Sequence, residues 1–490
     1  MVIEILGAKM LAPYVGTSHF VWTAQIAVTL VALAAGYYAG GRLVDRSTRL
    51  DPIYGAILAA GIYLCVTVLI VRPVAYWCLG FRLAIGSLLA SAFLFFLPLA
   101  LLAMVGPFFV RVLSSSLQGV GGNVGRLTAL STLGSFAGTV LIGYVLIPYL
   151  PNSWIMYCTA SLLFVVVGIY FAVWRRRSSS ATAVAVGVLT GLVAGYAGVE
   201  VERRGTFTEA IERFRGNSNF GQLQVVDLKS GARRYYLNDY LVQNVYDPTN
   251  GTSATLFTYM LHGLARAYTP GIERVLCIGL GVGIVPSQFA SEGASVDVVE
   301  INPAVVTVGR EFFGCHPEQF RLSIGDGRQF VNAATNRYDA IILDAFLGDS
   351  SPSHLMSREA FQSMRRLLNP NGALVINSFA EFDAGKDFLG ASLEKTLKSV
   401  FKSVRIHQSP RGNVFFVASD QETLKLNTPM DLNAVHAVVR DEAETTLSAI
   451  VEANPRHGIV LTDDYNPVEY YDAANRERIR RQLALGMRSL

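Results

Sequence analysis

Two hydrophobic patterns divide the chain. Up to residue 200, apolar residues form nearly uncharged stretches of roughly 20 residues, the length that an α-helix needs to cross a hydrocarbon core. The stretches cover residues 21–39, 53–71, 83–105, 127–150, 154–174 and 181–199. Beyond residue 262, short apolar runs alternate with amphipathic segments, as strands and helices do in an α/β fold. The pattern predicts a multi-span α-helical membrane domain with about six transmembrane helices over residues 1–200.

The remainder is predicted to hold a small β-unit and a Rossmann-like domain. Residues 220–226 and 234–242 alternate in polarity and flank Lys229-Ser230-Gly231, which predicts a β-hairpin within a linker and hairpin subdomain at 201–262. Residues 263–490 alternate strands with helices and end in a pair of strands. This order predicts a class I methyltransferase-type sheet of seven strands with one strand reversed.

A glycine-rich turn follows the first buried strand of this domain. Gly279, Gly281 and Gly283 come directly after the apolar run 275–278. Glycines at this point let the chain turn tightly and let a ligand approach the backbone. Glu300 lies near the end of the next strand, about 20 residues on, where an acid can accept hydrogen bonds from both ribose hydroxyls. The spacing predicts a nucleoside site.

Two further acids follow strands of the same predicted sheet. Asp326, followed by Gly327, comes after the strand 322–324, and Asp344 ends the run 338–343. Because ligands of open α/β sheets bind outside the carboxyl ends of the strands, Glu300, Asp326 and Asp344 should converge on one crevice. The alternative for Asp326 and Asp344 is an ordinary N-cap or turn role, which Asp also favours.

Composition excludes several other functions. Charged residues make up 16% of the chain and the net charge is +4, with no basic run interleaved with aromatics, so we expect no nucleic-acid binding. The five cysteines are scattered and fit neither a disulfide framework nor a metal site. The seven histidines show no ligand spacing, so we expect no metal. His354 lies near Asp349, where a surface loop role is the expected one.

Residues 219–470 resemble the spermidine synthases, the polyamine aminopropyltransferases. The matching residues are Gly221-Gln222-Leu223, Leu237-Asn238-Asp239, Gln243, the glycine turn, Glu300, Gly325-Asp326-Gly327, Tyr338-Asp339 and Asp344. The whole chain resembles bacterial proteins that fuse a multi-span membrane domain to such a module. That resemblance lies in Leu11-Ala12-Pro13-Tyr14, residues 36–45 and the run Thr462-Asp463-Asp464-Tyr465-Asn466-Pro467-Val468.

The resemblance implies a sulfonium nucleoside as co-substrate and a small-molecule amine as acceptor. Asp344 would be the catalytic carboxylate that orients the attacking amine and takes its proton. The residues implied to bind the co-substrate, decarboxylated S-adenosylmethionine or S-adenosylmethionine, are Gly279, Gly281, Gly283, Glu300, Asp326, Gly327 and Gln243. Those implied on the acceptor side are Gln222, Asp349, Tyr465 and Asp464, the last two through a loop whose alternative is a solvated turn.

The chain departs from the aminopropyltransferase pattern in its acids. Val282 stands where the family usually has an acid in the glycine loop, and Leu347 stands where a second acid follows the catalytic one. The acidic polyamine-binding segment has become residues 253–262, without a carboxylate. This loss of carboxylates argues against the binding of a di-cationic amine as the acceptor. Three functions stay open: aminopropyl transfer, methyl transfer from S-adenosylmethionine, and a non-catalytic nucleoside- or polyamine-binding scaffold.

Topology can be read from the arginines. Arginines follow the first span at 42, 46 and 49, the third at 111 and 126, and the fifth at 175–177. They predict cytoplasmic ends for these three spans. Six spans would then place the C-terminal domain outside the cell, unless 181–199 forms a shallow hairpin or lies at the interface. Because the nucleoside is cytosolic, we expect a multi-pass inner-membrane protein with a cytoplasmic domain. Residues 1–19 are expected to form an interfacial or re-entrant segment. Residues 476–488 are expected to form a basic, solvated helix. We also expect the chain to form a homo-oligomer.

Overall fold

The computed structural model divides the protein into two compact units, Met1–Thr208 and Glu209–Leu490. We call these the N-terminal and the C-terminal unit. The structure describes residues 1–16, 19–114, 119–174, 178–203, 209–346, 352–383, 385–454, 456–471, 477–478 and 481–482.

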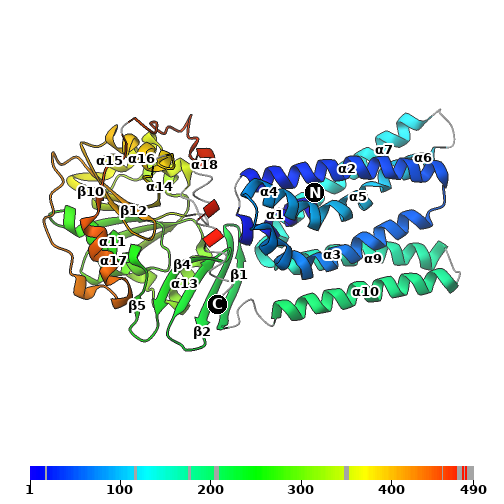
Figure 1. The fold of residues 1–490 in the computed structure, drawn as a ribbon, viewed down its shortest axis with the longest axis horizontal. Helices are drawn as coiled ribbons and strands as arrows, with labels where there is room; N and C mark the ends of the chain where they lie inside the picture. The colour runs from blue at the N-terminus through cyan, green and yellow to red at the C-terminus, as the bar shows by residue number, and fades with distance from the viewer. Residues whose placement is uncertain are drawn as a thin grey trace. The chain divides into compact units, whose positions relative to one another are not determined.

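The described part of the N-terminal unit consists of helices and the turns between them. Its helices are α1 (Val2–Val15), α2 (His19–Arg46), α3 (Asp51–Cys78), α4 (Leu83–Ser91), α5 (Leu97–Ala103), α6 (Val105–Leu113), α7 (Val120–Val140), α8 (Ile147–Tyr149), α9 (Asn152–Trp174) and α10 (Ser178–Arg203). Two π-helical turns, η1 (Ala92–Phe96) and η2 (Leu141–Leu146), join α4 to α5 and α7 to α8. Figure 1 shows α3, α9 and α10 packed lengthwise against one another.

Among the described residues, five helical segments have the length and apolar composition to cross a membrane. They are Phe20–Arg46, Asp51–Cys78, Leu83–Leu113, Val120–Tyr149 and Asn152–Val173. A sixth, shorter apolar stretch, Val184–Glu200, lies within α10. Because α10 is one continuous helix over 26 residues, the shallow hairpin considered for 181–199 is wrong.

The N-terminal segment forms a helix of its own. Residues 2–15 form a single helix that continues through Pro13 and ends where Gly16 adopts a positive φ of 87°. Ten of its residues are buried, including Leu6, Leu11 and Tyr14, so the segment packs as a helix within the N-terminal unit. Its interfacial or re-entrant position in a membrane stays a prediction. A proline near the end of a helix removes only one backbone donor, and the neighbouring helices provide the packing that the sequence pattern did not reveal.

The C-terminal unit begins with a five-stranded antiparallel sheet in the order β1-β2-β3-β4-β5. Its strands are β1 (Ala210–Ser218), β2 (Gly221–Leu228), β3 (Arg234–Asn238), β4 (Leu241–Asp247) and β5 (Thr252–Ser253). The expected strand 234–242 is therefore two strands. Asp239 and Tyr240 turn the chain between them at positive φ of 48° and 60°, a conformation usually signalled by glycine. The Asp239 carboxylate accepts a hydrogen bond from the Gln222 backbone N–H at 2.9 Å, which holds this turn.

The second sheet confirms the class I methyltransferase-type fold. Its order is β13-β11-β12-β10-β9-β6-β7-β8. The strands are β6 (Arg274–Ile278), β7 (Ser295–Glu300), β8 (Arg321–Ile324), β9 (Tyr338–Leu343), β10 (Leu368–Phe379), β11 (Ser403–Gln408), β12 (Asn413–Ser419) and β13 (Ile450–Val451). The strand β12 runs antiparallel to its neighbours β10 and β11, as expected for the reversed strand. The eighth strand, β13, has two residues and no pattern that could be read from the sequence.

Helices cover both faces of this sheet (Figure 1). They are α11 (Leu256–Tyr268), α12 (Ile284–Ser291), α13 (Pro303–Phe312), α14 (Gly327–Ala333), α15 (Arg358–Leu367), α16 (Phe388–Lys398), α17 (Arg440–Ser448) and α18 (Val468–Tyr471). Alternate residues of β6 enter two separate cores: Val275 and Cys277 join the core with α11, and Leu276 and Ile278 join the one with α15. A sheet buried on both faces presents its strand ends as the place for a ligand.

Candidate active site

The glycine turn after β6 is shaped by two close contacts and one open position. A Cβ at Gly279, which has φ of 99°, would lie 2.2 Å from the backbone oxygen of Asp344. A Cβ at Gly283 would lie 2.3 Å from the Cys315 sulfur. By contrast, a Cβ at Gly281 would meet no heavy atom within 4 Å. The outer two glycines are thus required for packing, and Gly281 leaves room for a ligand against the backbone.

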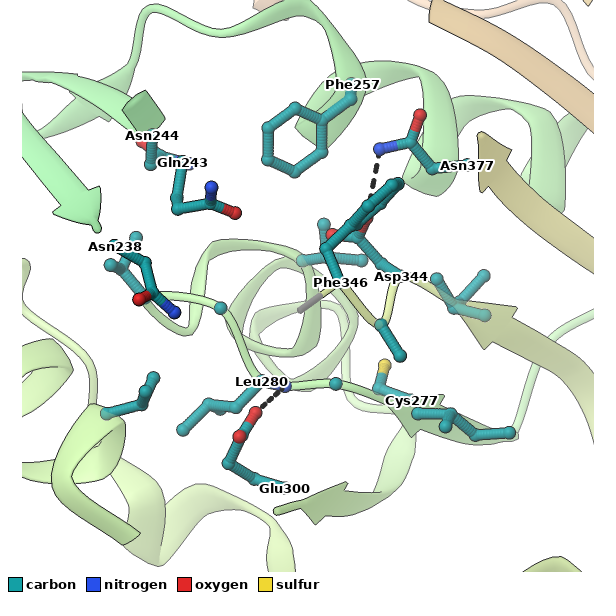
Figure 2. A pocket seen from close by; sticks show the side chains of 18 of the residues that line it. Asn238, Gln243, Asn244, Phe257, Cys277, Leu280, Glu300, Asp344, Phe346 and Asn377 are labelled. Carbon is teal, nitrogen blue, oxygen red and sulfur yellow. Dashed lines mark hydrogen bonds between the residues drawn. The ribbon is translucent and has the colours of Figure 1, made fainter. Parts of the chain in front are cut away.

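Glu300 is the last residue of β7 and is fixed by the backbone. Its carboxylate accepts hydrogen bonds from the N–H groups of Leu280, at 2.9 Å, and Asn302, at 2.8 Å. Burial raises the pKa of Glu300, and these backbone donors oppose the rise. The carboxylate is therefore held rigidly beside the glycine turn (Figure 2), where a ribose could reach it.

Asp344 follows β9 and ends a chain of hydrogen bonds between side chains. Asn413 Nδ2 donates to Asn377 Oδ1 at 3.0 Å, and Asn377 Nδ2 donates to Asp344 Oδ1 at 3.0 Å. Burial raises the pKa of Asp344 to about 6; the Asn377 hydrogen bond lowers it and the charge of Glu300 raises it. A carboxyl group that titrates near neutral pH suits a residue that must accept a proton in turnover.

Asp326 serves as a helix cap as well as part of the cavity wall. Its Oδ1 accepts from the Gln329 backbone N–H at 2.9 Å, so Asp326 is the N-cap of α14. Its Oδ2 lies 3.1 Å from Nε2 of His354. The cap alternative is therefore present, and His354 lines the cavity instead of serving only a surface loop. A ligand that bonds Asp326 would have to share it with this imidazole.

These residues surround one cavity of about 390 Å³. Gly279, Gly281, Glu300, Asp326, Gly327, Asp344 and Gln243 all line it. Figure 2 shows Glu300 and Leu280 on one side and Asp344 with Asn377 on another. The convergence of the three acids thus follows from the strand ends as expected, and the volume suits a nucleoside with a small acceptor.

Four predicted acceptor residues are not described as part of this cavity. Gln222 donates from Nε2 to Asn217 Oδ1 on β1 at 3.2 Å, so its side chain is used within the β-unit. Asp464 and Tyr465 are exposed, the latter at 60%. Asp349 lies outside the described residues. Asp464 and Tyr465 therefore lie outside the described cavity lining, and their role on the acceptor side stays a prediction.

A family model for the spermine/spermidine synthase domain matches residues 255–410. The C-terminal unit is thus similar to the spermidine synthases. A polyamine aminopropyltransferase of Vibrio vulnificus is 40% identical over 131 residues, which are 25% of this chain and 44% of that protein. Putrescine N-methyltransferase 1 of Nicotiana tabacum is 32% identical over 126 residues, 24% of this chain and 34% of that protein. The chain thus spans less than half of these curated relatives.

Among solved structures, a probable spermidine synthase from Corynebacterium glutamicum is similar to this chain. The TM-score is 0.40 at 18% identity, and the match covers 51% of this chain and 96% of that one.

The run 462–468 is bonded to Arg328 and to the segment 352–357 of the C-terminal unit. Asp463 accepts from Arg328 Nη2 at 2.8 Å and, through its other oxygen, from the Ser357 hydroxyl. Asn466 Nδ2 donates to the Ser353 backbone oxygen at 3.0 Å. These bonds join the run to the segment 352–357, which contributes to the cavity wall.

The sequence reasoning missed the two asparagines and the aromatic wall of the cavity. Asn377 could have been found, since it lies near the carboxyl end of β10 beside Asp344 in the next strand. Asn413 could not, because it begins the reversed strand β12 and reaches the site only through the pairing of Phe379 with Asn413. Phe257 and Phe346 lie in the wall (Figure 2), with no distinguishing sequence pattern around them.

Proposed function

We propose that the protein is a membrane-associated transferase that moves the aminopropyl group of decarboxylated S-adenosylmethionine to an amine. The observation that most supports this proposal is a single cavity with three features. It is lined by the Glu300 carboxylate, which backbone N–H groups hold in place, by the accessible backbone at Gly281, and by the Asp344 carboxylate, which is bonded to Asn377. The match of residues 255–410 to the spermine/spermidine synthase domain supports the reaction type.

The proposed reaction needs a positioned neutral amine and little else. Asp344 accepts a proton from the acceptor's ammonium and orients the amine nitrogen toward the carbon next to the sulfonium. The nitrogen–carbon bond forms as the carbon–sulfur bond breaks, and the electron pair of that bond stays on sulfur. The products are the aminopropylated amine, neutral methylthioadenosine and a proton. Glu300 holds the ribose, and the leaving group requires no acid because it departs uncharged.

Methyl transfer from S-adenosylmethionine is the second candidate, favoured by Val282. This residue is 2% exposed and lines the cavity, so the position offers no charge to the ammonium of an aminopropyl group. The similarity to a plant putrescine N-methyltransferase agrees with this candidate. In that reaction the nitrogen attacks the methyl carbon, and S-adenosylhomocysteine leaves.

The two candidates differ in their nucleoside product. The full-length protein in lipid nanodiscs should be incubated with an amine mixture and either S-adenosylmethionine or its decarboxylated form, with products separated by mass. Methylthioadenosine from the decarboxylated form supports aminopropyl transfer, and S-adenosylhomocysteine supports methyl transfer. If both nucleosides bind and neither is consumed, the chain is a scaffold and the proposal is wrong.

We also propose a multi-pass inner-membrane location with the C-terminal unit in the cytoplasm. Five apolar helices support the membrane association, and the need for a cytosolic nucleoside supports the side. The arginine pattern favours the opposite side if α10 crosses the membrane. Labelling of a single exposed cysteine placed in the C-terminal unit of a cysteine-free variant, with an impermeant maleimide on intact cells, decides between them. Labelling before lysis would contradict the cytoplasmic side.

A further inference from the structure

The order of the parallel strands gives the cavity a direction. Asp344 follows β9, the glycine turn follows β6, Glu300 ends β7 and Asp326 follows β8, and these strands lie in the order β9-β6-β7-β8. Neighbouring strands are about 4.8 Å apart. In the proposed reaction the ribose lies at Glu300 and the sulfonium faces Asp344. The base of the nucleoside therefore extends the other way, toward Asp326.

Two segments form the wall at this end of the cavity. One is residues 325–327, and the other is residues 352–355, which include the short 3₁₀ helix η4 (Ser353–Leu355). The segments pack together, because a Cβ at Gly327 would lie 3.7 Å from the methyl carbons of Leu355. Leu355 is buried in the core that contains α15. The helix η4 is thus anchored, and its middle residue, His354, lines the cavity.

Hydrogen bonds also hold the backbone of η4 around His354. Asn466 Nδ2 donates to the Ser353 backbone oxygen at 3.0 Å, and Arg328 Nη1 donates to the His354 backbone oxygen at 3.4 Å. The His354 Nε2 atom lies 3.1 Å from Oδ2 of Asp326. A carboxylate only accepts hydrogen bonds, so Nε2 is the donor in this pair. The imidazole thus fixes one oxygen of Asp326, while the other caps α14.

The fixed carboxylate of Asp326 can still bind a ligand. Its side chain is 35% exposed, and a carboxylate oxygen that accepts one hydrogen bond can accept a second. A purine with a 6-amino group offers a donor to Oδ2. A 6-oxopurine would instead bring its carbonyl oxygen against Oδ2, and two acceptors that face each other both stay unpaired. Without the imidazole, Oδ2 would have no fixed direction and could also accept from the N1–H of a 6-oxopurine.

We infer that His354 is a positioning residue that makes the cavity selective for a 6-aminopurine nucleoside. It acts through Asp326, because its imidazole N–H directs Oδ2 toward the 6-amino group. This inference rests on the proposed function, which places an S-adenosyl nucleoside in the cavity. An ordinary ion pair at the surface would affect stability slightly and would not change which base is bound.

Equilibrium binding tests the inference without requiring turnover. The full-length protein in nanodiscs should be titrated by calorimetry with methylthioadenosine and methylthioinosine, which differ in the amino or oxo group at C6. We expect methylthioadenosine to bind at least about tenfold tighter, the cost of leaving one polar group unpaired. In His354→Phe, which keeps a ring and removes both nitrogens, this ratio should fall to about threefold or less. In His354→Gln, whose amide N–H replaces the donor, most of the ratio should return.

Two controls separate the role of His354 from a structural one. His316→Leu removes an exposed imidazole that pairs with Glu318 and does not line the described cavity, and it should leave the ratio unchanged. In a protein that already carries Asp326→Asn, His354→Phe should change the ratio by less than about twofold, because the imidazole acts through that carboxylate. Hydrogen exchange of residues 352–357 shows whether each variant keeps η4, and His354→Ala carries the same expectation if His354→Phe does not.

The outcomes distinguish this inference from the proposed function. An unchanged ratio in His354→Phe overturns the inference, as does an equal loss in His354→Gln. It is also overturned if the natural protein binds both nucleosides equally or binds neither. A ratio that falls in His354→Phe and returns in His354→Gln, in a protein that transfers no group from either sulfonium nucleoside, counts against the proposed function alone.

Discussion

Replacing Asp344 by Asn should abolish turnover while stabilising the fold. The change is isosteric, and the remaining side-chain oxygen can still accept the hydrogen bond from Asn377 Nδ2. The amide cannot take the acceptor's proton, so we expect at least about a 100-fold loss of kcat, within the usual range for a general base. Affinity for methylthioadenosine should stay within about threefold, because Glu300 and the glycine turn are unchanged.

The stability gain follows from the pKa of Asp344, which burial raises to about 6. In the unfolded chain an aspartate has a pKa of about 3.9. Between these values the unfolded chain has released the proton and the folded chain still holds it, so this group's contribution to stability falls as pH rises. The difference corresponds to at most about 3 kcal/mol above pH 6. The Asn variant lacks this penalty, so its advantage should grow from near zero at pH 4 to its maximum by pH 7.

Hydrogen exchange of the β6 and β9 peptides in the full-length protein measures this difference. Tryptophan fluorescence does not, because Trp22, Trp77, Trp154 and Trp174 all lie in the N-terminal unit. Asp339→Asn, also on β9, is the matched control. Asp339 Oδ2 accepts from the backbone N–H groups of Glu273 and Arg274 at 2.9 Å each, so its loss should destabilise the unit.

One pattern would refute this reasoning. If Asp344→Asn destabilised the unit as Asp339→Asn does, or if its advantage did not change between pH 4 and pH 7, Asp344 would not be a buried carboxyl with a raised pKa.

Three other changes follow from the same geometry. Asn377→Leu removes the hydrogen bond that lowers the pKa of Asp344. The acidic limb of the kcat/KM profile against pH, expected near pH 6, should therefore move to higher pH. An unmoved limb would contradict this role of Asn377. Gly279→Ala should destabilise the unit by about 2 kcal/mol or more, because its Cβ would meet a backbone oxygen. Gly281→Ala should weaken nucleoside binding with little change in stability. Thermal unfolding measures the first effect, and titration with the nucleoside measures the second. Asp463→Ala removes the carboxylate that accepts a hydrogen bond from Arg328 Nη2. Hydrogen exchange of residues 352–357 should therefore rise, and KM for the nucleoside should increase by a larger factor than kcat decreases.

Most of the fold could be predicted, because its pattern is local. Strand and helix periods identified β6, β7, β9 and the helices between them, and the reversed strand followed from the closing strand pair. The turn at Asp239 and Tyr240 was missed because residues other than glycine adopt positive φ there, held by a hydrogen bond to Gln222 from another strand. The burial of helix 2–15 against other helices could not be predicted, because a local reading of Pro13 and Gly16 does not include contacts with distant segments.

The sequence by itself determined the two-part architecture and the residues at the carboxyl ends of the parallel strands. Parallel strands place those ends at one edge, so Gly281, Glu300 and Asp344 had to meet whatever the details of packing. Only the tertiary structure decided what surrounds them. Asn413 reaches Asn377 through an antiparallel pairing, and Phe257 arrives from a helix far from Asp344 in sequence. Such contacts depend on how segments distant in sequence pack together, and no local pattern encodes that packing.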